Sequence, residues 1–440
     1  MAKITADFTK ITGRIKPMHG VGQPPITGLT NEMFHYLKEA GIPYARLHDV
    51  GGMFGGGCFV DIPNLFPDFD ADVKDPASYT FEFTDKLIEG LMENGCEPFF
   101  RLGITIENYV DVRAYRVDPP KDFDKWARIC EQVIRHYNEG WANGYNYDIK
   151  YWEIWNEPEG KAMWNAPFSE YCRLYDITSK HLKECFGDKI KVGGYASCGF
   201  YALDKDLEMT GIGLDPSNTM ERYIQNFYTF MEYVSEHKCP LDFFSWHSYS
   251  AVHAVKRYGE YSHKILEKYG YGNIEEILNE WNPCHTMENK KGGWAAAQNL
   301  AMMLGMQKST LTMMNYYDAR CGSSIFSGMF NPDTKKPYPN YYGFMSFNSL
   351  YRLENEIEAE SDDANLFVGG ATDGKKKVLL LSNINGTETE TEFCINGADI
   401  SDVEILMIND EYKYSPTGKE IEDGKLVIPP HTCVEIKFYE

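Results

Sequence analysis

The sequence lacks any apolar run of the roughly 18 residues that a membrane-spanning helix needs. Residues 1–7 also lack the apolar core of a secretory signal peptide. No Cys-x-x-Cys pair occurs among the 11 cysteines, and their odd number and irregular spacing argue against a disulfide framework or a zinc site. We therefore expect a cytoplasmic protein with free thiols, no membrane partner and no bound metal.

Positive charge is scarce as well, because 43 Lys and Arg stand against 65 Asp and Glu, for a net charge of −22. An acidic surface repels nucleic acid and anionic lipid, so we expect neither as a partner. Aromatic residues, in contrast, make up 14% of the chain. Their ring faces suit the apolar faces of sugars, although a core rich in rings explains them equally well. A homo-oligomer is compatible with the sequence, which does not fix the number of subunits.

Short apolar segments alternate with amphipathic helical segments from about residue 16 to residue 351. The predicted strands are 18–22, 44–50, 97–102, 149–157, 190–196, 242–249, 276–281 and 311–318. Asp122 and Ser169 stand where helix N-caps belong. Helical crossovers imply parallel strands, and eight such strands close a (β/α)8 TIM barrel. An open doubly wound sheet is the alternative, but residues 20–25 lack a third glycine in register, and Pro24-Pro25 prevents a helix from beginning there.

The pattern changes after residue 351 to short strands at 378–381, 390–394, 403–409, 425–428 and 433–438, separated by turns such as Asn385-Gly386. This predicts a small β-sandwich. We therefore expect an α/β protein with a catalytic barrel over residues 13–353. A C-terminal β-sandwich would cover residues 354–440, completed by a strand from residues 1–12.

Two segments, 150–158 and 275–282, are aromatic-rich and apolar, and both contain Asn-Glu near their end. Each predicts a buried strand that delivers a carboxylate, Glu157 or Glu280, to the strand's C-terminal tip, where barrels carry their catalytic groups. Two facing carboxylates are what hydrolysis of a glycosidic bond requires. Glu153 and Glu276 lie four residues earlier on the same strands, hence on the same faces but about 13 Å deeper, and we expect them to be structural.

The strings Tyr151-Trp152-Glu153-Ile154-Trp155-Asn156-Glu157-Pro158, Trp246-His247-Ser248-Tyr249 and Leu278-Asn279-Glu280-Trp281 resemble glycoside hydrolase family 39, the β-xylosidase and α-L-iduronidase family of clan A. The resemblance implies a retaining double displacement without a cofactor, with Glu157 as acid/base and Glu280 as nucleophile about 5–5.5 Å apart. It also implies that Asn156 binds the sugar hydroxyl next to the anomeric carbon. The pKa of Glu157 must then lie near the working pH, raised by burial and by the charge of Glu280.

Further candidates for substrate binding follow from alternation along the predicted strands. Arg46 and His48 share a face, so Arg46 could hold Glu280 ionised while His48 binds a hydroxyl. His247 and Tyr249 share another face: Tyr249 could donate to Glu280, and His247 could contact Glu157 or the sugar. Three rings could either wall the sugar subsite or pack within the barrel, namely Trp281, Trp155 and Phe330. Asp318 could contact substrate hydroxyls together with Arg320, or the two could form a salt bridge.

The predicted function is that of an exo-glycosidase that removes a terminal sugar, most plausibly β-xylose, from short oligosaccharides. The long loop 51–77 departs from the β-xylosidase pattern, so an arabinoside or a glucoside stays open as the substrate. Its Asp68-x-Asp70-x-Asp72 lacks the glycine and glutamate of a calcium loop. A non-catalytic carbohydrate-binding protein would not need paired acids, and His19, His48 and His247 show no ligand spacing for a metal-dependent hydrolase.

Overall fold

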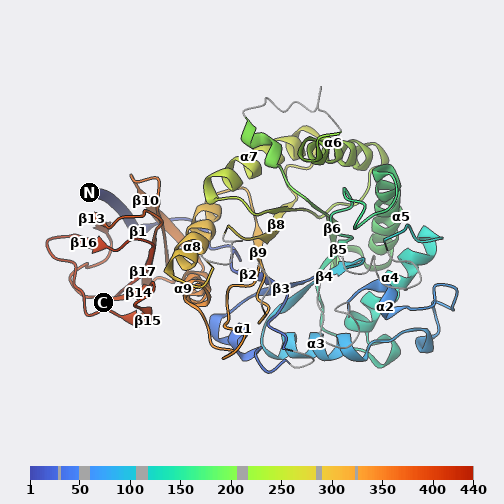
Figure 1. Cartoon of the computed structure of the whole chain (residues 1–440), viewed down its shortest axis with the longest axis horizontal. Helices are drawn as coiled ribbons and strands as arrows, with labels where there is room; N and C mark the ends of the chain where they lie inside the picture. The colour runs from blue at the N-terminus through green and yellow to red at the C-terminus, as the bar shows by residue number, and fades with distance from the viewer. Residues whose placement is uncertain are drawn as a thin grey trace.

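The structure, a computed structural model, describes residues 1–27, 31–48, 60–105, 117–205, 217–283, 290–322 and 326–439. Eight parallel strands close into a barrel in which each strand pairs with the next one along the chain, and the last pairs with the first (Figure 1). The strands are β2 (Gly20–Gly22), β3 (Tyr44–Leu47), β4 (Glu97–Leu102), β5 (Tyr151–Ile154), β6 (Lys191–Ser197), β7 (Phe243–Ser248), β8 (Glu275–Trp281) and β9 (Met313–Tyr317). The predicted (β/α)8 barrel is confirmed.

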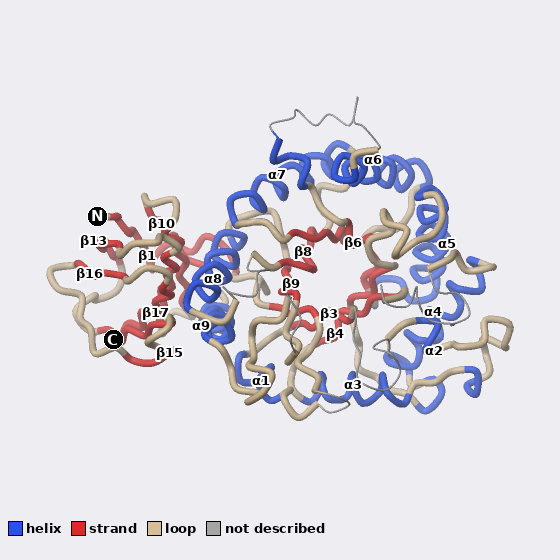
Figure 2. The backbone as a smooth tube through the Cα atoms, viewed as in Figure 1, coloured by secondary structure: helices blue, strands red, loops and turns tan. Residues whose placement is uncertain are grey.

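Helices surround the barrel strands as an outer ring (Figure 2). They are α1 (His35–Ala40), α2 (Ile62–Leu65), α3 (Glu82–Glu93), α4 (Phe123–Glu139), α5 (Phe168–Phe186), α6 (Thr219–His237), α7 (Val252–Lys268), α8 (Gly293–Gln307) and α9 (Pro339–Leu353). Asp122 caps α4 as predicted, because its carboxylate accepts a hydrogen bond of 2.9 Å from the Lys125 N–H. Ser169 does not cap α5, which begins one residue earlier, at Phe168 after Pro167. Among the described residues no helix combines the length and apolarity needed to span a bilayer.

The barrel interior is layered, because successive residues of a strand point to opposite faces. An apolar layer fills the N-terminal end and consists of Phe99, Tyr151, Phe243, Ile277 and Met313. Two residues further along, the same strands place a polar layer above it, made of Arg101, Glu153, Ser245 and Asn279. The barrel is therefore apolar below and polar toward the C-terminal ends of its strands.

A second sheet of nine strands follows the barrel and includes the N-terminal strand β1. It contains β1 (Ala2–Arg14), β10 (Asn355–Ser361), β11 (Leu366–Thr372), β12 (Lys377–Asn383), β13 (Thr389–Asn396), β14 (Val403–Ile408), β15 (Lys413–Pro416), β16 (Lys425–Ile428) and β17 (Thr432–Phe438). The expected C-terminal β domain is thus present as one continuous, curled sheet with a hydrophobic core of its own.

Helices α8 and α9 lie between the barrel and this sheet (Figure 1). The contact is partly polar: Ser382 of β12 donates a hydrogen bond of 2.6 Å to the Ala297 carbonyl in α8, and Asp410 accepts one of 2.8 Å from the Gly293 N–H. The sheet therefore packs on the outside of the barrel. A domain boundary at residue 353 stays a prediction.

Candidate active site

Glu157 and Glu280 lie together at the C-terminal mouth of the barrel. A carboxylate oxygen of each and a ring nitrogen of His247 all fall within 4.8 Å of one another. The His247 Nδ1 atom lies 2.7 Å from Glu157 Oε1 and 3.4 Å from Glu280 Oε2. One imidazole thus connects two acids that are 123 positions apart in the sequence (280 − 157).

A single guanidinium organises the site from below. Arg46, which is 1% exposed, donates from Nη1 to Glu280 Oε1 and from Nη2 to Asn156 Oδ1, both at 2.7 Å. Its Nε donates to Glu153 Oε2 at 2.8 Å. Charge-assisted bonds of this kind fix geometry as well as charge. Arg46 therefore links Glu153 in the polar layer to the groups at the mouth.

Tyr249 completes the surroundings of Glu280. Its hydroxyl donates a hydrogen bond of 2.8 Å to Glu280 Oε2, the oxygen that Arg46 leaves open. Burial, and then the charge of Glu280, raises the pKa of Tyr249 well above its ordinary value, so the phenol keeps its proton. Each oxygen of Glu280 thus has its own donor.

The backbone brings both acids into the mouth by interrupting the regular alternation of side chains. After β5, Trp155 has φ 73° and Glu157 has φ 45°, values that side chains other than glycine seldom adopt. In β8 the register with β7 shifts between the pairs Trp246–Leu278 and His247–Glu280, which is a β-bulge. Both features re-aim one side chain at the point where the strand reaches the mouth.

Proton affinities differ strongly among these groups. Burial raises the pKa of Glu157 to about 7, while the Arg46 charge and a hydrogen bond with Cys198 lower it. The charge of Glu280, which we expected to add to this rise, does not contribute to it. Burial lowers the pKa of His247 to about 4, and it lowers the pKa of His48 well below the ordinary value, with the Arg101 and Arg46 charges adding to the effect. Near pH 6, therefore, Glu157 holds a proton and both imidazoles are neutral.

The cluster of Glu157, His247 and Glu280 has the composition of a cation site. Both oxygens of Glu280, however, already accept hydrogen bonds, one from Arg46 and the other from Tyr249. The aspartates of the loop after β3 serve local structure instead: Asp68 accepts from the Asp70 N–H, and Asp72 accepts from the Lys74 N–H. Residues 51–59 of that loop lie outside the described residues.

A family model described as "Glycosyl hydrolases family 39" matches residues 64–302, more than half of the chain. The chain belongs to glycosyl hydrolase family 39. The resemblance seen in its motifs is thereby confirmed, and this family-39 protein is a glycosidase.

Two curated relatives carry the name beta-xylosidase. The one from Geobacillus stearothermophilus is 26% identical over 252 residues, which are 54% of this chain and 43% of that protein. The one from Caldicellulosiruptor saccharolyticus is 25% identical over 434 residues, which are 87% of this chain and 79% of that protein. The chain thus matches less than half the length of the first relative.

Solved structures share the fold over the full chain. A glucosidase from Croceicoccus marinus superposes with a TM-score of 0.80 at 18% identity, covering 100% of this chain and 99% of that one. A monomeric beta-xylosidase from Caulobacter crescentus CB15 gives 0.72 at 15% identity, with the same coverage. At such low identity these likenesses establish the architecture alone.

Three rings predicted to wall the sugar subsite turn away from it in this family-39 barrel. Trp281 stacks on Phe344 of α9 and has no exposed surface. Phe330 packs against Tyr36 of α1 and Tyr341 of α9. Trp155 packs against Trp126 of α4 and donates to the Met163 carbonyl. The rings fill the space between the barrel and its helices, so barrel packing, the alternative for these three rings, is what the contacts show.

Asp318 forms the salt bridge that was the alternative to substrate contact. Its carboxylate accepts from Arg320 Nε at 3.0 Å and from Nη2 at 2.7 Å. Rings that the sequence analysis missed lie beside Tyr249 instead. The centroid of Phe326 is 5.0 Å from that of Tyr249, and the centroid of Tyr317 is 6.4 Å from it. Phe326 and Tyr317 lie next to Tyr249, which donates a hydrogen bond to Glu280. They are therefore better placed than Trp281, Trp155 and Phe330 to contact a sugar face.

We expected Glu153 and Glu276 to lie on the catalytic face, deep below the mouth. The structure differs from this expectation in two ways. Glu276 points outward, where Ser262 of α7 and Thr310 donate to it. The bulge in β8 puts it on the face opposite to Glu280. Glu153 does point inward, but it contacts Arg46 directly. Its role is therefore to position the arginine.

A third carboxyl near the mouth, Glu159, was missed by the sequence analysis. It is buried, and its Oε1 accepts from Ser197 Oγ at 2.9 Å and from the Cys198 N–H at 3.1 Å. Burial, and then the charge of Glu157, raises its pKa to about 8. The only signal in the sequence is its spacing, two residues after Glu157. It ties the end of β6 to the segment that carries the acid.

Proposed function

We propose that this family-39 glycosidase removes a terminal β-xylose from short oligosaccharides by a retaining double displacement. The observation that carries the proposal is the proximity of three atoms. A carboxylate oxygen of Glu157, a carboxylate oxygen of Glu280 and a ring nitrogen of His247 all lie within 4.8 Å of one another. That separation is shorter than the roughly 6.5–9.5 Å between the acids of inverting enzymes and fits the distance of about 5–5.5 Å typical of retaining enzymes.

The groups have distinct parts in the proposed first step. A Glu280 oxygen attacks the anomeric carbon while Glu157 gives its proton to the departing glycosidic oxygen. Glu157 suits this part because its pKa of about 7 keeps it protonated in mildly acidic solution. Arg46 fixes the Asn156 Oδ1 atom, so the amide Nδ2 is the group that donates to the sugar hydroxyl beside the anomeric carbon. In the second step water attacks, and Glu157 takes up its proton.

Xylose is proposed as the sugar because two relatives are named beta-xylosidases. The superposed Croceicoccus marinus protein is named a glucosidase, which keeps a glucoside as the second candidate. A panel of nitrophenyl glycosides of xylose, glucose and arabinose distinguishes them by kcat/KM. We expect the xyloside to be the best substrate, and a higher kcat/KM for the glucoside would reassign the sugar but leave the mechanism in place.

The stereochemistry is tested by NMR of the first product formed from nitrophenyl β-xyloside. We expect β-xylose to appear before mutarotation, and initial α-xylose would exclude retention.

Glu280→Ala should abolish turnover, with azide restoring it partially as the α-glycosyl azide. Glu276→Gln is the matched control on β8, since its side chain faces α7. A loss of activity in both variants would point to damage to the strand rather than to a nucleophile.

A cytoplasmic location is part of the proposal. The nine cysteines within the described residues all carry free thiols, which suits a reducing compartment. Fractionation of the source cells with an antibody to the protein tests this, and recovery in the medium would contradict it.

A further inference from the structure

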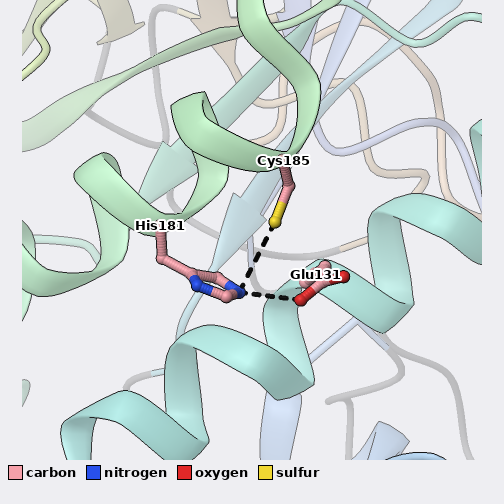
Figure 3. Close-up of side chains that lie close together, drawn as sticks. All are labelled: Glu131, His181 and Cys185. Carbon is pink, nitrogen blue, oxygen red and sulfur yellow. Dashed lines mark hydrogen bonds and ion pairs between the residues drawn. The ribbon is translucent and has the colours of Figure 1, made fainter.

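Helices α4 and α5 bring three side chains of different chemistry together on the outside of the barrel (Figure 3). Glu131 comes from α4, and His181 and Cys185 come from α5. One ligand atom of each lies within 4.8 Å of the others. None of these residues takes part in the proposed hydrolysis.

The His181 Nε2 atom lies at the centre of the group. It is 2.7 Å from Glu131 Oε2 and 3.8 Å from Cys185 Sγ. His181 and Cys185 are four residues apart on one helix, so they face the same side, one turn apart. The two ligands from α5 are therefore held in place by the helix itself, and α4 supplies the third.

These distances approach those of a tetrahedral zinc centre. With bonds of about 2.0–2.1 Å to nitrogen or oxygen and 2.3 Å to sulfur, neighbouring ligand atoms lie roughly 3.4–3.6 Å apart. The sulfur and nitrogen already lie close to this spacing. The nitrogen and oxygen must separate by about 0.7 Å when the ion binds.

We propose that Glu131, His181 and Cys185 bind one Zn²⁺ ion, with water as the fourth ligand. Thiolate, imidazole and carboxylate together select zinc over magnesium or calcium, which prefer oxygen ligands alone. On binding, the Cys185 thiol releases its proton to solvent, and His181 binds through Nε2 while its ring proton stays on Nδ1. The side chains of Glu131 and His181 are 14% and 27% exposed, so an ion can reach them from solvent.

Arg135 orients the carboxylate without occupying the metal-facing oxygen. Its Nε donates to Glu131 Oε1 at 2.7 Å, whereas Oε2 faces His181. The guanidinium stacks on the Phe186 ring at 5.0 Å and also pairs with Glu139, so a second carboxylate balances its charge. Partners of this kind around metal ligands commonly fix the ligand orientation.

The test is a titration of the purified full-length protein, stripped with a chelator, with Co²⁺ as the probe and Zn²⁺ as the competitor. We expect one equivalent of Co²⁺ to give a near-ultraviolet thiolate-to-cobalt charge-transfer band, which one equivalent of Zn²⁺ removes. His181→Gln and Glu131→Gln keep the thiol and should weaken Zn²⁺ binding at least tenfold. Cys185→Ser should abolish the band.

Two control variants separate this site from others. Cys394→Ser removes an exposed thiol on β13, and Glu157→Gln alters the acid pair at the mouth; both should bind Zn²⁺ as the wild type does. Absence of the band in the wild type, its loss in Cys394→Ser, or unchanged Zn²⁺ affinity in His181→Gln and Glu131→Gln would overturn the proposal. Thermal melts in chelator show whether each variant is folded, so a loss of binding is read only from folded protein.

Discussion

Replacing Arg46 by methionine tests the electrostatics of the whole site, because this one side chain donates to Glu280, Glu153 and Asn156. The change leaves two buried carboxylates without their cation. Breaking a buried ion pair by removing one partner costs about 3–5 kcal/mol. The protein will reduce this cost by binding a proton on one of the acids, which disables Glu280 as a nucleophile at low pH.

The expected result is a displaced pH profile. Removal of the adjacent positive charge favours the protonated form of a carboxylate, so the acid limb of kcat/KM should move to higher pH in Arg46→Met. The melting temperature should fall as well. The assay is hydrolysis of a nitrophenyl glycoside between pH 4 and pH 9, with circular dichroism for the melts. Arg46→Lys keeps the charge but cannot reach three acceptors, and it should move the limb less.

Arg101→Met is the matched control, because Arg101 is also buried and pairs with Asp61 at 2.7 Å, away from Glu280. It should lower the melting temperature by a comparable amount while the acid limb stays in place. An acid limb that coincides in wild type and Arg46→Met would refute the reasoning. Equal displacement of the limb in Arg101→Met would attribute the effect to general destabilisation.

The raised pKa of Glu157, about 7, predicts that kcat/KM declines above pH 7 as the acid loses its proton, and that Glu157→Gln lacks this limb. Between pH 4.5 and about 7 the folded protein keeps this proton, whereas the unfolded chain has released it. The free energy of unfolding should therefore fall as the pH rises through this range, and it should fall less in Glu157→Gln. Denaturant titrations measure this change. Tyr249→Phe removes one hydrogen bond to the buried Glu280 carboxylate, worth about 1.5–3 kcal/mol, and should lower kcat/KM at least tenfold and the melting temperature as well. Glu159→Ala leaves the Ser197 hydroxyl and the Cys198 N–H without an acceptor and should destabilise the fold by about 1–3 kcal/mol. Glu159→Gln retains an acceptor and should not destabilise it. Equal melting temperatures for the two variants would count against a structural role of Glu159.

The barrel was predictable because alternation of apolar strands and amphipathic helices is a local property of the sequence. All eight predicted barrel strands overlap β2–β9, and the turn-rich strands after residue 351 form the second sheet. The proximity of Glu157 and Glu280 was predictable from their positions at the C-terminal ends of two predicted strands. Helix starts were less secure: Asp122 caps α4, but Pro167, which fixes its own φ, moves the start of α5 ahead of Ser169.

Long-range contacts within the site could not be read from spacing. Glu159 is important because the end of β6 folds onto it, and no local pattern states which strand lies beside it. Phe326 and Tyr317 lie beside Tyr249 because the barrel closes and brings these distant segments together. Trp281 could not be assigned to a face from its residue type, since a tryptophan suits a sugar and a helix interface equally well.

The errors over Trp155 and Glu276 have one physical cause, a break of side-chain alternation at each Asn-Glu pair. A regular pleat places residues i and i+4 on one face. It would then turn Trp155 inward with Glu153 and put Glu276 beneath Glu280. Instead, two consecutive residues face the interior in both strands: Asn156 and Glu157 contact Arg46 and His247, and Asn279 and Glu280 contact Glu153 and Tyr249. Each strand thereby supplies an amide and an acid to one small volume, an arrangement that a regular strand cannot provide because neighbouring side chains on it diverge.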